Sequence, residues 1–160
     1  MKRVIALAIA VSFAATAFGQ GELIFNHRGS GSGQVLGADG VPLVGTTYSG
    51  QLYGGATADS LSPIVDIKGG GSAIFPFPGS AAPAALHGYV ASQNNTVIVP
   101  GVGPGNAAFV QLRVWNNQDG ALTDWDSAVN VSEWGDSGTA LQTPGGLGGP
   151  NPPDPDLTAT

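Results

Sequence analysis

Glycine and proline interrupt this chain so often that long helices have little room to form. The 160 residues include 26 glycines and 12 prolines. Beyond residue 19, no stretch keeps an amphipathic 3.6-residue pattern over three turns. Apolar side chains instead recur in short alternating runs between the glycines, which is typical of strands joined by tight turns. The sequence therefore predicts an all-β fold, a single antiparallel β-sandwich of jelly-roll or immunoglobulin-like kind.

The clearest strand candidate is 107–116, where Val110, Leu112 and Val114 share one face and are expected to point into the core. An Asp-Gly pair at Asp39 and Gly40 predicts a tight turn. Further strands are expected at 22–26, 46–53, 64–67, 72–75, 86–91, 96–99 and 139–143. The glycines at 54 and 55 are expected to end the second of these, and only 122–131 suits a short helix.

The first residues predict export. Lys2 and Arg3 precede an uncharged apolar run too short to span a membrane, and small residues follow it, so 1–19 is interpreted as a signal peptide. We expect a β-sandwich domain over 20–145 and a disordered Pro, Gly and Asp tail over 146–160. The mature chain is then secreted, periplasmic or envelope-associated, without a membrane span.

Charge and cysteine content narrow the function classes. After loss of the signal peptide, three basic residues remain against eleven acidic ones, which gives 3 − 11 = −8. Nucleic-acid binding needs clustered cations, so it is excluded. The chain has no cysteine, so its fold must depend on packing and hydrogen bonds, which is typical of a bacterial exported protein without disulfides.

Four segments resemble a group of uncharacterised exported bacterial proteins of the PEP-CTERM-associated type, from Verrucomicrobia-like bacteria. They are QGELIFNHR at 20–28, GQLYGG at 50–55, VPGVGPG at 99–105 and VQLRVW at 110–115. The resemblance implies a small β-sandwich and carries over no catalytic residue. The sorting signal of that group needs an apolar span and a basic end, and the last ten residues have neither.

A cluster of oxygen-bearing side chains follows the strand at 107–116 and is of the kind that Ca²⁺ binds. The spacing approaches that of an EF-hand loop with Gly120 as its sixth position, but Trp115 would then stand where a carboxylate is needed. The alternative interpretation, which we favour, is an Asn and Asp turn in which these side chains bond their own backbone. The candidate metal ligands are Asn117, Asp119, Asp124 and Asp126. No other cofactor is expected.

The tryptophans allow two interpretations. Exposed indole rings stack on sugars, so a flat platform would bind a glycan. Buried aromatics are, however, the usual content of a small β-core, and we favour core packing. The candidate ligand-binding residues are Trp115, Trp125 and Trp134.

Support for catalysis is weak. Two carboxylates across a cleft would be needed for glycoside hydrolysis, but so small a domain leaves little material for a deep cleft. The serines at 29–33 lie in a loose Gly-Ser loop without a following helix, unlike a nucleophile elbow. The available carboxylates are Glu22, Asp66, Asp124, Asp126, Glu133 and Asp136.

The sequence therefore favours a non-enzymatic extracellular or envelope-associated structural or interaction protein, with a glycan or a cell-surface protein as its partner. The alternative function is a carbohydrate-binding module that uses exposed aromatics, supported by Ca²⁺. A small secreted hydrolase is the weakest alternative.

Overall fold

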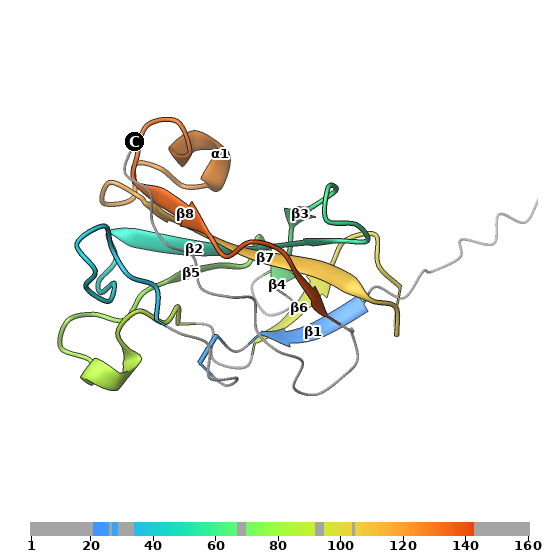
Figure 1. The fold of residues 1–160 in the computed structure, drawn as a ribbon, viewed down its shortest axis with the longest axis horizontal. Coiled ribbons are helices and arrows are strands. Elements are labelled where there is room, and N and C mark those ends of the chain that lie inside the picture. The colour runs from blue at the N-terminus through green and yellow to red at the C-terminus, as the bar shows by residue number, and fades with distance from the viewer. Residues whose placement is uncertain are drawn as a thin grey trace, which may run out of the picture.

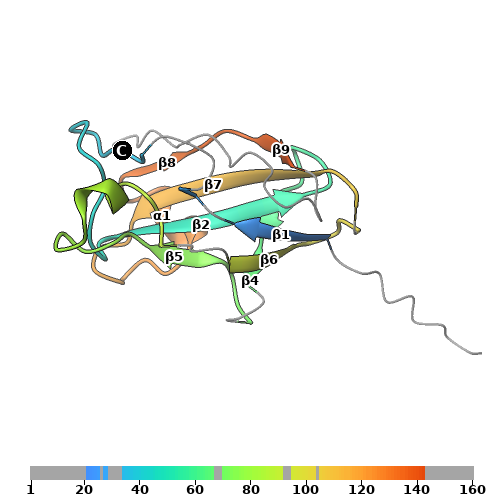
Figure 2. The same cartoon turned by 90° about the horizontal axis from the view of Figure 1, so that it is seen from below.

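A computed structural model of the chain describes residues 21–25, 27–28, 34–66, 70–91, 95–103 and 105–142. The expected signal peptide at 1–19, the Gly-Ser loop at 29–33 and the tail at 146–160 lie outside the described residues. The described part of the chain forms two antiparallel sheets that pack against each other (Figures 1 and 2). The predicted all-β sandwich is confirmed. No helix among the described residues is long and apolar enough to cross a membrane.

The smaller sheet has three strands, in the order β1-β6-β4. The larger sheet is built on two long central strands, β2 and β7, which pair from Tyr48 opposite Asn116 to Gly55 opposite Phe109. Two short strands share each outer side, since β3 and β5 pair with β2 while β8 and β9 pair with β7. The strands are β1 (Gly21–Phe25), β2 (Tyr48–Gly55), β3 (Ser62–Pro63), β4 (Val65–Asp66), β5 (Ile74–Pro76), β6 (Asn95–Val99), β7 (Ala108–Asn116), β8 (Trp134–Asp136) and β9 (Ala140–Gln142).

Alternation along β7 gives the larger sheet two apolar faces. Leu112 and Val114 belong to the main core between the sheets, as the sequence predicted, whereas Trp115 belongs to a second cluster with Trp125 of helix α1 (Trp125–Ala128). Figure 1 accordingly shows α1 on one side of the larger sheet, with β1 and β6 on the other. Helix α1 lies within the predicted helical segment 122–131.

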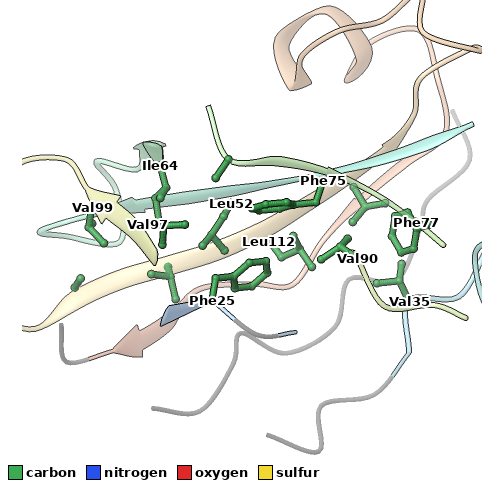
Figure 3. Close-up of a cluster of buried hydrophobic side chains, with 14 of the residues drawn as sticks. Phe25, Val35, Leu52, Ile64, Phe75, Phe77, Val90, Val97, Val99 and Leu112 are labelled. Atoms are coloured by element: carbon green, nitrogen blue, oxygen red, sulfur yellow. The ribbon is translucent and has the colours of Figure 1, made fainter. Parts of the chain in front are cut away.

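The main core is filled by branched and aromatic side chains. Figure 3 shows Phe25 of β1 beneath Leu52 of β2 and Leu112 of β7, and all three are almost completely buried. Gly54 lets the layers approach closely, because a Cβ atom there would lie 2.8 Å from Ile64 Cδ1 and 2.9 Å from Val99 Cγ1. Strand β2 therefore continues through Gly54 and Gly55, and the expectation that these glycines end it was wrong.

The expected strand at 86–91 is also wrong. A 3-10 helix, η1 (Ala84–Leu86), begins after Pro83, and the His87 amide closes it by donating to Ala84 O at 3.1 Å. The backbone amides that follow do not form a strand ladder. Ala91 N, for example, donates to Pro76 O at 2.9 Å. Strand β8 was missed, since three residues that include a glycine are too short to show alternation.

Candidate functional site

A pocket of about 390 Å³ lies between the 37–44 loop and one end of the larger sheet. Its volume falls within the range of small-ligand sites. Among the lining residues, Tyr48 is the first residue of β2 and Glu133 directly precedes β8. We call this the acidic pocket, lined by Gly37, Ala38, Asp39, Val41, Pro42, Leu43, Val44, Tyr48 and Glu133.

The 37–44 loop is held in shape by its own turn. Gly40 has a positive φ of 74° and donates to Gly37 O at 2.8 Å, which confirms the predicted Asp-Gly turn. Asp39 also stabilises this turn, because its Oδ1 accepts a hydrogen bond from the Val41 amide at 3.0 Å. Leu43 is buried and donates to Val35 O at 3.0 Å, so the loop is attached to the core at its base.

Glu133 joins the loop to the sheet. Its Oε1 accepts from the Ala38 amide at 3.2 Å, and its Oε2 accepts from the Tyr48 hydroxyl at 2.8 Å. Its backbone oxygen accepts from the Asn116 amide at 2.8 Å, which continues the pairing of β7 beside β8. One half-buried carboxylate therefore connects the 37–44 loop and the start of β2 to the residue that precedes β8.

The Tyr48 hydroxyl is held as a hydrogen-bond donor. Burial, together with the hydrogen bond to Glu133 and the negative charge of Glu133, raises the pKa of Tyr48 to about 12. Asp39 adds a smaller repulsion of the phenolate. The phenol is therefore neutral at physiological pH and presents a fixed polar group at the acidic end of the pocket.

The predicted calcium ligands are not assembled into a site. Asn117 is buried and its side-chain amide is engaged in hydrogen bonds, since Nδ2 donates to Thr46 O at 2.7 Å and to Ser49 Oγ at 2.9 Å, while Oδ1 accepts from Gly120 N at 3.1 Å. Among the described residues, no three His, Cys, Asp or Glu side chains are grouped so that they could hold a metal ion. The turn interpretation of this segment therefore accounts for Asn117.

The three aspartates of that set have separate positions. Asp119 has a positive φ of 57° and its Oδ1 lies 3.4 Å from the Thr47 hydroxyl. Asp124 is the N-cap of α1, where its Oδ1 accepts from Ser127 N at 2.8 Å in a capping box. Asp126 is exposed in the first turn of the same helix.

The three tryptophans do come together, but as a packed cluster. Trp125 makes edge-to-face contacts with Trp115 at 6.5 Å and with Trp134 at 5.3 Å between ring centroids. Trp115 is 0% exposed and Trp125 is 7% exposed. Rings at interplanar angles of 79° and 81° do not form one flat surface. The structure does not present these tryptophans as an exposed stacking platform.

Next to the tryptophans, Arg113 lies between aromatic rings. Its guanidinium carbon is 3.9 Å from the Tyr53 ring centroid and 5.2 Å from that of Trp125. Its Nε donates to Gln111 Oε1 at 2.7 Å, and Gln111 Nε2 donates to Asp136 Oδ1 at 3.0 Å. The Arg113 guanidinium therefore packs within the second apolar cluster.

Sequence reasoning did not find the acidic pocket. It noted Glu133 only as one of several carboxylates and Asp39 only as a turn residue. The contacts that join them, from Ala38 and Tyr48 to Glu133, span 95 and 85 residues, and no local pattern encodes such distant pairs. The Asp-Gly turn was the one signal present in the sequence.

Comparison with known proteins adds no relative: none of the protein-family models, curated proteins or solved structures compared with the chain matches it.

Proposed function

We propose that the chain is an exported, non-enzymatic interaction protein that presents the acidic pocket, on a rigid β-sandwich, to a partner at the cell surface or in the envelope. The observation that carries this proposal is the pocket itself. Its walls come from a loop fixed to the core and from the end of a central strand, so it is preformed and does not require ordering on binding.

The hydrogen bonds of the pocket favour recognition over catalysis. Both oxygens of Glu133 already accept a hydrogen bond, one from a backbone amide and one from Tyr48. The raised pKa of Tyr48 keeps its proton in place at neutral pH. General acid-base catalysis needs a group that exchanges its proton near the working pH, whereas this pair is suited to a fixed polar surface.

A glycan platform of tryptophans has less support. Trp115 and Trp125 are buried, and the edge-to-face packing of the cluster leaves no coplanar pair of rings. The resemblance of four segments to exported bacterial sandwich proteins supports the compartment and is independent of the pocket.

The experiment that tests the proposal is retention of envelope fractions on the immobilised chain that lacks residues 1–19. We expect retention from untreated fractions, loss of retention after the fractions are digested with protease, and reduced retention by the Glu133→Gln variant. The matched control is Asp126→Asn, which removes an exposed carboxylate outside the pocket.

A polysaccharide panel run on the same support, with and without a chelator, tests the alternative. Retention of a polysaccharide, or retention that survives protease treatment, would instead favour a carbohydrate-binding module. If the folded chain retains neither envelope proteins nor a polysaccharide, the proposal is contradicted.

A further inference from the structure

Among the described residues, the acidic pocket is lined by negative charge and by no cation. Asp39 and Glu133 are the charged residues of its lining, and the partners of Glu133 within it, the Ala38 amide and the Tyr48 hydroxyl, are neutral. A half-buried carboxylate that is solvated only in part gains most from a positively charged ligand. Charge complementarity therefore points to a cation as the occupant.

The shape of the pocket specifies what kind of cation fits. The residues at 41–44 give the pocket an apolar wall, and its carboxylates come from Asp39 in the same loop and from Glu133 before β8. An alkyl stem that ends in a charged head suits such a site, because the stem covers the apolar wall while the head reaches the carboxylate. Lysine has this form.

The geometry of Glu133 distinguishes lysine from arginine. A guanidinium binds a carboxylate best as a planar fork that donates to both oxygens at once. In Glu133 each oxygen already accepts one hydrogen bond, from Ala38 N and from the Tyr48 hydroxyl, so a fork would have to fit the one remaining lone pair of each oxygen. An ammonium is a compact charge that needs only a remaining lone pair on one oxygen.

The rim of the pocket points to a macromolecule as the source of this lysine. Val41 lines the pocket and is nevertheless 57% exposed. A small free amine bound inside would leave most of Val41 in contact with water, whereas a protein surface around the inserted lysine would cover it. The net negative charge of the chain also favours the approach of a basic partner.

We infer that the acidic pocket receives a lysine side chain from an exposed segment of a protein partner, with its ammonium at Glu133 and Asp39 and its stem along 41–44. This inference rests on the proposed function and specifies the partner's chemistry.

The test uses the chain that lacks residues 1–19 and a capped peptide with one lysine between two leucines. Amide resonances of 37–44 and of 133 are followed by NMR as the peptide is added. We expect saturable shifts there, and an affinity that falls about tenfold or more when the lysine is acetylated or when Glu133 is replaced by Gln. Asp126→Asn should bind the peptide as the unaltered chain does.

Three outcomes would overturn the inference: equal binding of the lysine and acetyllysine peptides, shifts located away from the pocket, or no shifts at all. Butylamine is titrated in the same way as a small free amine. Equal affinity for butylamine and for the peptide would overturn the assignment to a protein partner. Retention of envelope proteins that Glu133→Gln reduces, without any binding of the lysine peptide at the pocket, would sink this inference while the proposed interaction function stands. Pocket binding of the peptide without any envelope retention would contradict the function and leave the lysine site intact.

Discussion

The Arg113 guanidinium lies over the face of the Tyr53 ring, 3.9 Å from its centroid, although the two residues belong to different strands. Tyr53 on β2 pairs with Gln111, so Arg113 is its diagonal neighbour on β7. The same guanidinium lies 5.2 Å from the Trp125 ring centroid, and Tyr53 and Trp125 belong to one apolar cluster. This contact ties the central strands to the second apolar cluster.

Replacing Arg113 with Lys should lower the free energy of unfolding by about 1 kcal/mol, because a flexible ammonium loses the planar contact and the Nε hydrogen bond to Gln111. Urea unfolding monitored by tryptophan fluorescence measures this change in the free energy of unfolding. In a Tyr53→Leu background the cost of the same change should shrink. An identical cost in both backgrounds would show that the ring contact contributes nothing.

Adding a methyl group at Gly54 should destabilise the sandwich by about 1–3 kcal/mol, because the new Cβ would press on Ile64 and Val99 between the sheets. The matched control is Gly79→Ala, where no atom lies within 4 Å of the added Cβ, and its effect should stay within about 0.5 kcal/mol. Thermal unfolding of both variants makes the comparison. Equal effects would mean that the layers are not in close contact at Gly54.

Alkaline titration should reveal the environment of Tyr48. Its folded pKa of about 12 lies above the ordinary 10.0, so the unfolded chain releases this proton first as the pH rises. The stabilisation is complete below the unfolded pKa and is lost as the pH rises through the folded one. The free energy of unfolding should therefore fall over this range, and fall less steeply in Tyr48→Phe. Burial also raises the pKa of Tyr53, so part of the slope persists in that variant.

The stability of the chain at low pH should depend on the ionisation of Asp124. Its pKa is lowered chiefly by the hydrogen bond from the Ser127 amide, so its contribution is present above the unfolded pKa and disappears as the pH falls through the folded one. Asp124→Ala should lower the thermal midpoint at neutral pH, and the gap to the unaltered chain should close in acid. Asp126→Ala, in the same helical turn without the capping bond, should show a smaller gap. A gap for Asp124→Ala that does not depend on pH would refute the charged cap.

Local pattern was enough to predict much of the sandwich. Strand β7 and its core face follow from Val110, Leu112 and Val114 at alternate positions, and the Asp-Gly turn follows from the need for a positive φ. The end of β2 was predicted wrongly because glycine has two opposite structural roles. In a loop it permits a turn, whereas at Gly54 it makes room for side chains from elsewhere in the fold.

The site depended on contacts that no window of sequence contains. The hydrogen bond from Ala38 to Glu133 joins residues 95 apart, so the acidic pocket exists only once β8 lies beside β7. The tryptophans illustrate the converse. Their composition also allowed a sugar platform, and only the position of α1 over Trp115 determined that Trp115 and Trp125 are buried.

The outer sides of the larger sheet differ from its centre, and this difference bears on self-association of the chain. The long ladder of β2 and β7 is enclosed, while its outer sides carry only short pieces, β3 and β5 on one side and β8 and β9 on the other. Between β8 and β9, the Ser137 hydroxyl takes the Leu112 amide at 2.9 Å, so a side chain occupies a position that a foreign strand would need. Interrupted edges of this kind give a second copy no long template for pairing, and they protect the sandwich from edge-to-edge aggregation.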